Sequence, residues 1–302
     1  MTTLVTLVGE QALPALSVAR TLRCERTVLV CTEQTRYVGE RLAPLTDGAL
    51  LVLADAYRID RIADALRERL AGVLAGAVFD VTGGTKPMSL AAFGVAAAAG
   101  RPAVYLRTTG MQPVVSVYHH GPDGAAAHAE AVPVPRDALT LDDYLRAYAG
   151  GYDLTGPATD DEGRVNEGGR FELAVAEALR TCCDEVLVGV KPAGLGQQVD
   201  LDLVVRRGTR VGVVECKLAR DRKLDKPKQG LDQLMQATDR AAFGSHVVRM
   251  LVLGAPLNRA LQRLADDRRV EVAWVSYRDG QPLHAEGVRV LRQVVAHAFD
   301  RA

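Results

Sequence analysis

Residues 80–88 read Asp-Val-Thr-Gly-Gly-Thr-Lys-Pro-Met, and they join a strand-like run, Ala77–Val81, to a helix-like run. The pair Gly83-Gly84 allows backbone N–H groups to come close to an anion, and a helix start adds unpaired N–H donors. Pro87 suits a first helical turn, where its missing N–H costs nothing. The side chains that could donate to a phosphate are Thr82, Thr85 and Lys86. The stretch predicts an anion site, with a simple capped turn as the alternative, and its spacing fits neither a Walker A loop nor GxGxxG.

Around this turn, strand-like and helix-like runs alternate. The strand-like runs are Thr3–Val8, Thr27–Cys31, Leu50–Leu53, Ala77–Val81, Pro102–Leu106 and Val114–Tyr118. The helix-like runs are Leu13–Leu22, Gln34–Leu42, Ile59–Val73 and Met88–Ala99. The alternation predicts a mostly parallel sheet with helices on both faces, a Rossmann-like domain that binds ligands at its carboxyl edge. Residues 121–135 are expected to form a loop, and Leu139–Tyr148 one more helix.

The second half of the chain has a different rhythm. A helix is expected from about residue 167 to 181, followed by three strand-like runs: Val186–Val190, Val199–Val205 and Val211–Lys217. The last two runs are joined by a hairpin-sized loop that contains a glycine. The remaining expected elements are a helix over 229–240, a strand over 247–253, a helix over 258–267, a strand over 270–275 and a helix from about 291. This pattern predicts a second α/β domain, with the domains spanning residues 1–150 and 151–302.

Composition limits the class of protein. The chain has 302 residues, of which 48% are hydrophobic and 25% charged, as in globular proteins. Its 37 basic residues balance 37 acidic ones, which argues against a uniformly basic nucleic-acid coat. The start lacks a signal peptide, no apolar run is long enough to span a bilayer, and the five cysteines form no CxxC pair. We therefore expect a soluble protein of the reducing cytoplasm, without a membrane partner or a disulfide framework.

A second group of polar residues follows two adjacent valines in a strand-like run. Because side chains two apart in a strand share a face, Glu215 and Lys217 point one way and Cys216 the other. Asp200 and Asp202 likewise share a face of the neighbouring predicted strand. Carboxylates brought so close repel one another unless a cation intervenes, and oxygen ligands suit Mg²⁺ or Mn²⁺. The pattern predicts a divalent metal site, and an exposed, salt-bridged hairpin face is the alternative.

Residues 217–228 contain six basic and two acidic residues next to this predicted cleft. Such a stretch suits contact with a phosphate backbone without base reading, although a solvated loop has the same composition. Other polar or aromatic residues are given structural roles. His119-His120 is expected to end a strand, and Trp274 to lie in a strand core. Cys216 is expected to pack in the core, although its backbone carbonyl could reach a metal.

The glycine turn resembles the signature of CARF domains, the cyclic-oligoadenylate sensors of type III CRISPR systems. The resemblance rests on residues 82–88, on Val8-Gly9-Glu10-Gln11 with Pro14 after the first strand, and on Thr32 after the second, and it covers about the first 150 residues. It implies a ring of adenylates bound across a homodimer at these strand ends. The ligand-binding residues it implies are Gly9, Gln11, Thr32, Thr82, Gly83, Gly84, Thr85, Lys86 and Met88.

The second half resembles the PD-(D/E)xK nuclease superfamily over about residues 160 to 255. The match is Glu172 on the leading helix, Asp202 on a strand, and Glu215-Cys216-Lys217 on the next. The resemblance implies that Glu172, Asp202, Glu215 and Lys217 are catalytic, and that the three acids and the Cys216 carbonyl hold Mn²⁺ or Mg²⁺. The superfamily often has Glu-apolar-Asp before the hairpin, whereas this chain has two aspartates there. Asp200 therefore remains a rival to Asp202.

Together the two resemblances imply the architecture of the type III CRISPR nucleases that cyclic tetra-adenylate activates. The expected fold is an N-terminal Rossmann-like CARF domain followed by a restriction-endonuclease-like α/β domain. The expected partners are cyclic tetra-adenylate, a second copy of the chain, and single-stranded or nicked or supercoiled DNA, or RNA, as substrate. Two other functions remain open: a sensor that regulates by binding, with an inactive nuclease-like domain, and a restriction or repair nuclease.

Overall fold

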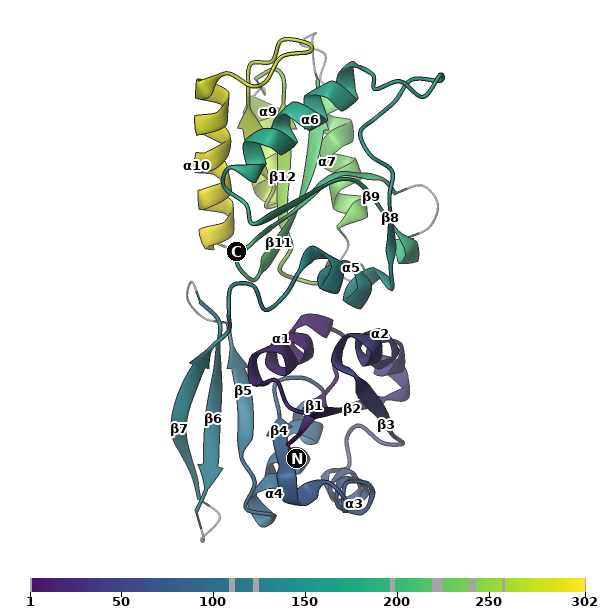
Figure 1. Ribbon diagram of the computed structural model, residues 1–302, viewed down its shortest axis with the longest axis vertical. Coiled ribbons are helices and arrows are strands. Elements are labelled where there is room, and N and C mark those ends of the chain that lie inside the picture. Colours follow the sequence, from purple (N-terminus) through teal and green to yellow (C-terminus); the bar gives the residue numbers. More distant parts are fainter. Residues whose placement is uncertain are drawn as a thin grey trace. The chain divides into compact units, whose positions relative to one another are not determined.

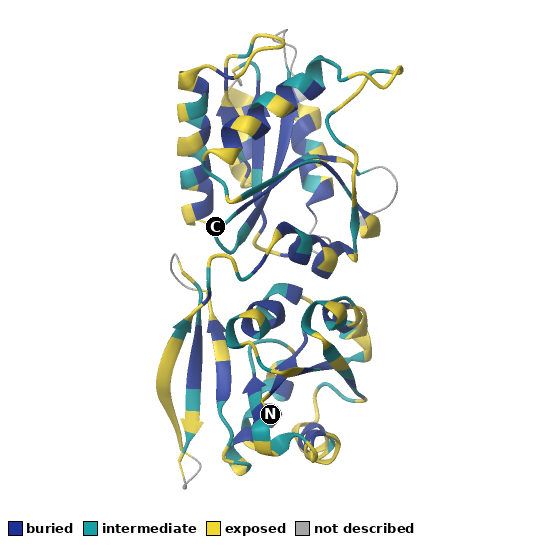
Figure 2. Ribbon diagram, viewed as in Figure 1, coloured by how far each residue is buried: buried dark blue, intermediate teal, exposed yellow. Residues whose placement is uncertain are grey.

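The computed structural model describes residues 2–108, 112–121, 125–195, 199–218, 225–238, 243–256 and 259–301. It contains two β-sheets, each with its own set of helices (Figure 1). Most strands are dark blue in Figure 2 because they are buried, whereas the helices alternate between buried and exposed faces. This is the burial expected of amphipathic helices that pack on a hydrophobic sheet.

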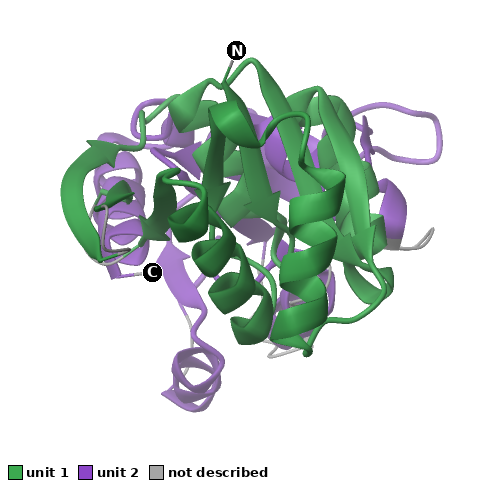
Figure 3. Cartoon of the chain, turned by 90° about the horizontal axis from the view of Figure 1, so that it is seen from below, with its two compact units in different colours: residues 1–139 green, residues 140–302 purple. Residues whose placement is uncertain are grey.

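The chain divides into two compact units, Met1–Leu139 and Thr140–Ala302 (Figure 3). This division lies before helix α5 (Leu141–Ala149), whereas the sequence placed that helix in the first domain and the boundary after residue 150. In the structure α5 packs within the second unit. The Tyr144 ring lies 6.1 Å from the Phe243 ring, centroid to centroid, and its hydroxyl donates a hydrogen bond to the Phe243 carbonyl.

The first unit is built on a seven-stranded sheet in the order β3-β2-β1-β4-β5-β6-β7. Its strands are β1 (Thr3–Leu7), β2 (Arg26–Thr32), β3 (Gly48–Leu53), β4 (Ala77–Asp80), β5 (Ala103–Arg107), β6 (Val114–His120) and β7 (Ala126–Pro133). Its helices are α1 (Ala12–Leu22), α2 (Arg36–Thr46), α3 (Ile59–Arg69) and α4 (Lys86–Ala98). Strands β1 to β5 are parallel to one another. Strand β6 pairs antiparallel with β5, and β7 pairs antiparallel with β6. The strand order reverses between β1 and β4, which is where doubly wound sheets bind ligands.

Strand β7 corrects the expectation of a loop over residues 121–135. Seven of its eight residues pair antiparallel with β6, with a register shift that leaves out Ala129, and most of its side chains are exposed. Alanine-rich sequence gives little strand signal, so the pairing depends on main-chain hydrogen bonds with β6 rather than on a hydrophobic face. Val132 does pack on the core, against a cluster that includes Leu106 and Val115.

The second unit is built on a six-stranded sheet in the order β13-β12-β11-β10-β9-β8. Its strands are β8 (Tyr152–Leu154), β9 (Glu185–Pro192), β10 (Leu201–Arg207), β11 (Arg210–Lys217), β12 (Val248–Leu253) and β13 (Glu271–Trp274). Besides α5, the helices among its described residues are α6 (Glu167–Arg180), α7 (Asp225–Ala237), α9 (Arg259–Asp267) and α10 (Ala285–Arg301). Strands β8 to β11 are antiparallel and β11 to β13 are parallel. Among the described residues, no helix is long and apolar enough to cross a membrane.

The two faces of this second sheet have different coverings. One face packs on α6 and α10, whose Phe171 and Val295 share a buried cluster with Cys216. Because strand side chains alternate, the neighbours of Cys216 along β11 point to the other face. Helix α7 covers that face with fully buried leucines, among them Leu231. The odd-numbered residues of β11, including Glu215, are therefore on the side that α7 covers.

Candidate active site and ligand-binding turn

The β10–β11 hairpin brings Asp202 and Glu215 together. Leu203 pairs with Val214 across the antiparallel ladder, so the next residues outward, Asp202 and Glu215, lie opposite each other. The Asp202 Oδ2 atom accepts a hydrogen bond of 2.7 Å from the Cys216 backbone N–H. In a strand, the N–H and C=O of one residue point toward the same neighbour, so the Cys216 carbonyl also faces the Asp202 side.

Lys217 lies beside Glu215, as the two-residue period of a strand predicts. Its ammonium forms an ion pair of 2.5 Å with Glu215 Oε1, and the Glu215 side chain is 5% exposed. Burial alone would lower the pKa of Lys217, but the charges of Glu215 and Asp202 outweigh it and raise that pKa. The ammonium is therefore held charged inside an acidic site.

Glu172 reaches the site from helix α6. It is buried, and its Oε2 atom accepts a hydrogen bond of 3.0 Å from the Ala158 backbone N–H. That segment lies tightly against the helix, because a Cβ on Gly169 would come within 2.1 Å of the Ala158 carbonyl oxygen. The glycine thus allows the segment before α6 to hold the Glu172 carboxylate.

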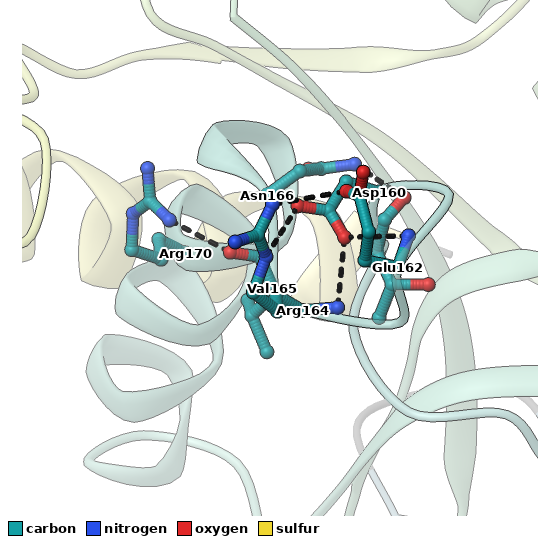
Figure 4. A network of polar contacts seen from close by, with 7 residues as sticks. Asp160, Glu162, Arg164, Val165, Asn166 and Arg170 are labelled. Atoms are coloured by element: carbon teal, nitrogen blue, oxygen red, sulfur yellow. Dashed lines mark hydrogen bonds and ion pairs between the residues drawn. The ribbon is translucent and has the colours of Figure 1, made fainter.

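A network of polar contacts fixes the turn that leads into α6 (Figure 4). The Asp160 carboxylate accepts hydrogen bonds from the backbone and the guanidinium of Arg164. Asn166 caps the helix by accepting from the Gly169 N–H at 2.9 Å, and it donates to the Thr159 carbonyl. The Arg170 guanidinium donates a hydrogen bond to the Val165 carbonyl. Together with the Asn166–Thr159 bond, this connects the start and the end of the turn to the first turn of α6. The helix that carries Glu172 therefore starts from a fixed point.

The three acids share an electrostatic environment that resists their ionisation. Burial raises the pKa of Glu215 to about 7, and the nearby Asp202 adds to this. Burial and then Asp202 raise the pKa of Glu172 to about 7, and burial also raises that of Asp202. Lys217 supplies one positive charge against three carboxylates, of which Glu172 and Glu215 are buried and Asp202 is half-buried, so the group would gain from a further cation. Asp200 is exposed just before β10 and raises the pKa of Asp202 by its negative charge.

The donor set of this site fits a divalent cation by its chemistry. Carboxylate and carbonyl oxygens are the ligands that Mg²⁺ and Mn²⁺ prefer, and Glu172, Asp202 and Glu215 supply them beside the Cys216 carbonyl. Over the part of the chain that the structure describes, no group of three His, Cys, Asp or Glu side chains already surrounds one point. A cation would therefore have to draw these carboxylates together and take Glu215 from Lys217.

Gly230 on helix α7 is a site residue that sequence reasoning did not find. A Cβ there would lie 3.0 Å from Leu251 Cδ1, 3.1 Å from Lys217 Cγ and 3.6 Å from Glu215 Cγ. The glycine lets α7 pass closely over both site residues. The sequence did contain one signal, a glycine inside a predicted helix. Glycine destabilises a helix interior, so its presence there can indicate that another element packs closely against the helix.

The basic stretch over residues 217–228 is only partly visible. Its residues 219–224 lie outside the described residues, as do the side chains of Asp225 and Lys226. Lys228 lies on α7 and is exposed.

In the first unit, the glycine turn lies against the end of β1 at the point where the strand order reverses. A Cβ on Gly83 would meet the Leu7 carbonyl oxygen at 2.1 Å, and one on Gly9 would meet the Gly84 nitrogen at 3.2 Å. Gly84 has a φ of +72°, which favours glycine. The structure therefore places Gly9 beside the turn, while Thr32 ends β2, which neighbours β1. Gln11, which precedes α1, follows the end of β1.

The side chains of the turn have mostly structural partners. The Thr82 hydroxyl donates to Asp80 Oδ1 at 2.5 Å and accepts from the Leu106 N–H at 2.8 Å. The Thr85 hydroxyl donates to a backbone carbonyl of residue 56 and accepts from the Met88 N–H at the start of α4. Met88 itself is buried in the core, whereas Lys86 is exposed. The groups best placed to meet an anion are thus the backbone N–H donors of the turn and the Lys86 ammonium.

Asp80 is a second residue that sequence reasoning left without a role. It is fully buried at the end of β4, and its carboxylate accepts hydrogen bonds from the Thr6 hydroxyl at 2.6 Å and from both the N–H and the hydroxyl of Thr82. Burial outweighs these bonds and raises the pKa of Asp80 to about 6. Asp80 ties β1 to the first residues of the glycine turn.

Comparisons with known proteins agree with this architecture. Residues 3–144 match the family model of the Card1 CARF domain. No curated protein sequence matches the chain. Among solved structures, Can2 from Sulfobacillus thermosulfidooxidans in complex with cyclic tetra-adenylate matches at a TM-score of 0.71 and 17% identity, over 99% of both chains. Protein VC1899 from Vibrio cholerae matches at a TM-score of 0.72 and 13% identity, over 99% of this chain and 97% of its own.

A third solved structure is described as a type III CRISPR defence DNA nuclease activated by cyclic oligoadenylate. It matches at a TM-score of 0.65 and 17% identity, over 96% of this chain and 51% of its own. At these identities the likeness to solved structures is one of fold. Residues 3–144 match the CARF family model, and the two sheets confirm the α/β fold expected from the sequence, in which a Rossmann-like domain is followed by a second α/β domain.

Proposed function

We propose that this protein is a metal-dependent nuclease that cyclic tetra-adenylate switches on in type III CRISPR defence. The observation that carries the proposal is the group of Glu172, Asp202, Glu215 and Lys217, which lies in the same chain as a match to the CARF family model. Can2 is described in complex with cyclic tetra-adenylate, and another protein of similar fold is described as a nuclease activated by cyclic oligoadenylate. We extend both descriptions to this chain.

In the proposed reaction, the three acids and the Cys216 carbonyl would hold Mn²⁺ or Mg²⁺. When bound, such a cation supplies polarisation of a phosphodiester and a bound water of lowered pKa. The Cys216 N–H orients Asp202 and the Ala158 N–H orients Glu172, so both carboxylates are held near the site before a cation draws them together. Lys217, once released from Glu215, can donate a charge-assisted hydrogen bond to a phosphate oxygen.

In the proposed sensor, the glycine turn meets the phosphates of the ring. Its backbone donors and Lys86 supply positive potential at the carboxyl edge of the sheet, next to Gly9, Gln11 and Thr32. A cyclic ligand with rotational symmetry fits best on a two-fold axis, so we expect a homodimer formed through the first unit. We expect the protein to act in the cytoplasm, where invading nucleic acid is met.

The experiment that tests this proposal is a substrate panel. The protein is incubated with single-stranded DNA, supercoiled DNA and RNA, with Mn²⁺, Mg²⁺ or EDTA, and with or without cyclic tetra-adenylate. Cleavage that needs both a metal and the ring supports the proposal. Cleavage that ignores the ring indicates a restriction or repair nuclease, and ring binding without any cleavage indicates a regulatory sensor.

A further inference from the structure

Trp274, the only tryptophan of the chain, does not lie in a core. It ends strand β13 and is 51% exposed, contrary to the expectation from the sequence. The preceding residue, Ala273, packs in the cluster under α6 and α10. Because side chains alternate along a strand, the indole of Trp274 points to the opposite face of the sheet.

The register of the sheet connects Trp274 to the candidate active site. Lys217 on β11 pairs with Leu253 on β12, and Leu253 pairs with Trp274 on β13, in parallel register. Hydrogen bonds just beyond these pairs continue the ladder: the Gly254 N–H donates to the Lys217 carbonyl at 3.0 Å, and the Val275 N–H to the Leu253 carbonyl at 2.9 Å. Residues in register point to one face, so Trp274 and Lys217 share both a face and the carboxyl edge of the sheet, two strand spacings or about 10 Å apart.

An exposed indole at this place has a chemistry that the carboxylates and Lys217 lack. An aromatic face stacks on any nucleobase, whereas the acidic site and Lys217 can engage only the phosphate backbone. The bases of an intact duplex are already stacked inside it and offer no free face. The position of Trp274 therefore favours a strand whose bases are unpaired near the bond to be cut.

We propose that Trp274 is a stacking platform for an unpaired nucleobase next to the scissile phosphate. The inference rests on the proposed nuclease function and narrows its substrate to single-stranded nucleic acid or to locally unpaired segments. The platform reads no base edge, so binding through it tolerates any sequence.

The test uses the indole itself as the reporter, because no other tryptophan contributes to the fluorescence. The full-length protein is kept with cyclic tetra-adenylate and EDTA, so that nothing is cut. It is titrated with oligothymidylate, with oligouridylate, with a strand of equal length that carries abasic sugars, and with a duplex. We expect the two single strands to quench the fluorescence, and the abasic strand and the duplex to leave it nearly unchanged.

Affinity is then measured with labelled strands on Trp274→Ala, on Trp274→Phe and on the control Leu154→Ala. Leu154 is also an exposed apolar residue, at 59%, but lies on β8 at the other edge of the sheet. Trp274→Ala should weaken binding of single strands about five- to a hundredfold, and leave binding of the abasic strand unchanged. Trp274→Phe should keep part of the affinity, and Leu154→Ala all of it.

The outcomes separate this inference from the proposed function. Equal quenching by the abasic strand, unchanged affinity in Trp274→Ala, or no binding of any single strand would overturn the platform, even if the protein cuts nucleic acid. A Trp274→Ala protein that loses only self-association would show a protein contact instead, and would overturn it too. If the fluorescence is quenched only by strands that carry bases, and the protein cuts nothing, the result would support the stacking role of Trp274 and contradict the proposed nuclease activity.

Discussion

Asp202 and Asp200 share a face in the sequence pattern, but the structure gives them different surroundings. Asp202 lies on β10 opposite Glu215 and accepts the Cys216 N–H, whereas Asp200 is exposed just before the strand. We expect Asp202→Asn to reduce cleavage by at least a hundredfold, by loss of a proposed metal ligand, and Asp200→Asn by less than tenfold. Cleavage rates at saturating metal and cyclic tetra-adenylate measure this, and a reversed order would assign the metal to Asp200.

Lys86 is the one exposed cation on the glycine turn, residues 82–88, all of which the structure describes. Removing a charge-assisted hydrogen bond costs about 1.5–3 kcal/mol, so Lys86→Ala should need about ten- to a hundredfold more cyclic tetra-adenylate for half-maximal cleavage. Arg289→Ala, which removes an exposed cation on α10 of the second unit, outside both candidate sites, is the control. A titration curve for Lys86→Ala that coincides with that of the wild type would remove this residue from the site.

Some residue positions could be predicted from the sequence, and others depend on contacts that only the folded chain makes. The two-residue period correctly predicted that Glu215 and Lys217 share a face, because a strand fixes that spacing. It could not predict that Trp274 is exposed, because exposure depends on which helix covers the end of β13. The role of Asp80 likewise depends on Thr6, which is 74 residues away in the sequence and becomes its neighbour only through the β1–β4 pairing.

Helix α7 depends on Gly230 for its close approach to Lys217. A methyl group there would force its neighbours to move by a few tenths of an ångström, while alanine favours a helix by about 1 kcal/mol. We expect Gly230→Ala to keep its free energy of unfolding within about 1 kcal/mol of the wild type, but to slow cleavage on the order of tenfold by displacing Lys217.

The control for this change is Gly94→Ala on α4, where a Cβ would meet nothing within 4 Å. Gly94→Ala should raise the free energy of unfolding, because alanine stabilises a helix, and it should cut at the wild-type rate. Denaturant unfolding and cleavage rates on the same samples check both variants. Equal cleavage by Gly230→Ala and the wild type would show that the approach of α7 is not needed for the reaction.

The turn between β4 and α4 should respond to pH through Asp80. Its pKa is raised from 3.8 to about 6, so the folded state binds the proton more tightly, and Asp80 lowers stability as pH rises from about 4 to about 6. Asp80→Asn resembles the protonated form at every pH. The free energy of unfolding of the wild type should therefore fall by about 3 kcal/mol relative to that of the variant over that interval, which changes the stability gap between the two proteins. Denaturant unfolding at several pH values measures the gap, and a constant gap would contradict the raised pKa.

The elements were predicted best where side-chain patterns are strong. The valine-rich runs that became β2, β10 and β11 are buried strands, and apolar spacing located α3. Strand β7 was missed because its alanines form a strand only by pairing with β6. Strand β8 was missed because it is only three residues long, so its pairing with β9 left no pattern in the local sequence.

Over the entire chain, the two candidate sites lie in separate units. The glycine turn and Asp80 belong to residues 1–139, and the carboxylates with Lys217 to residues 140–302. Activation in this account requires that the ring bind the active arrangement of the protein more tightly than the resting one. We therefore expect ring binding and cleavage to be separable functions of the two units of one chain.

The most direct test of this claim is the cleavage rate of single-stranded nucleic acid by the wild type and by Glu215→Ala, each with and without cyclic tetra-adenylate. Calorimetric affinity for the ring is measured on the same samples. We predict that the ring accelerates cleavage by the wild type, that Glu215→Ala cuts nothing, and that both proteins bind the ring equally. Cleavage by Glu215→Ala at the wild-type rate, or loss of ring binding in a folded Glu215→Ala protein, would contradict it.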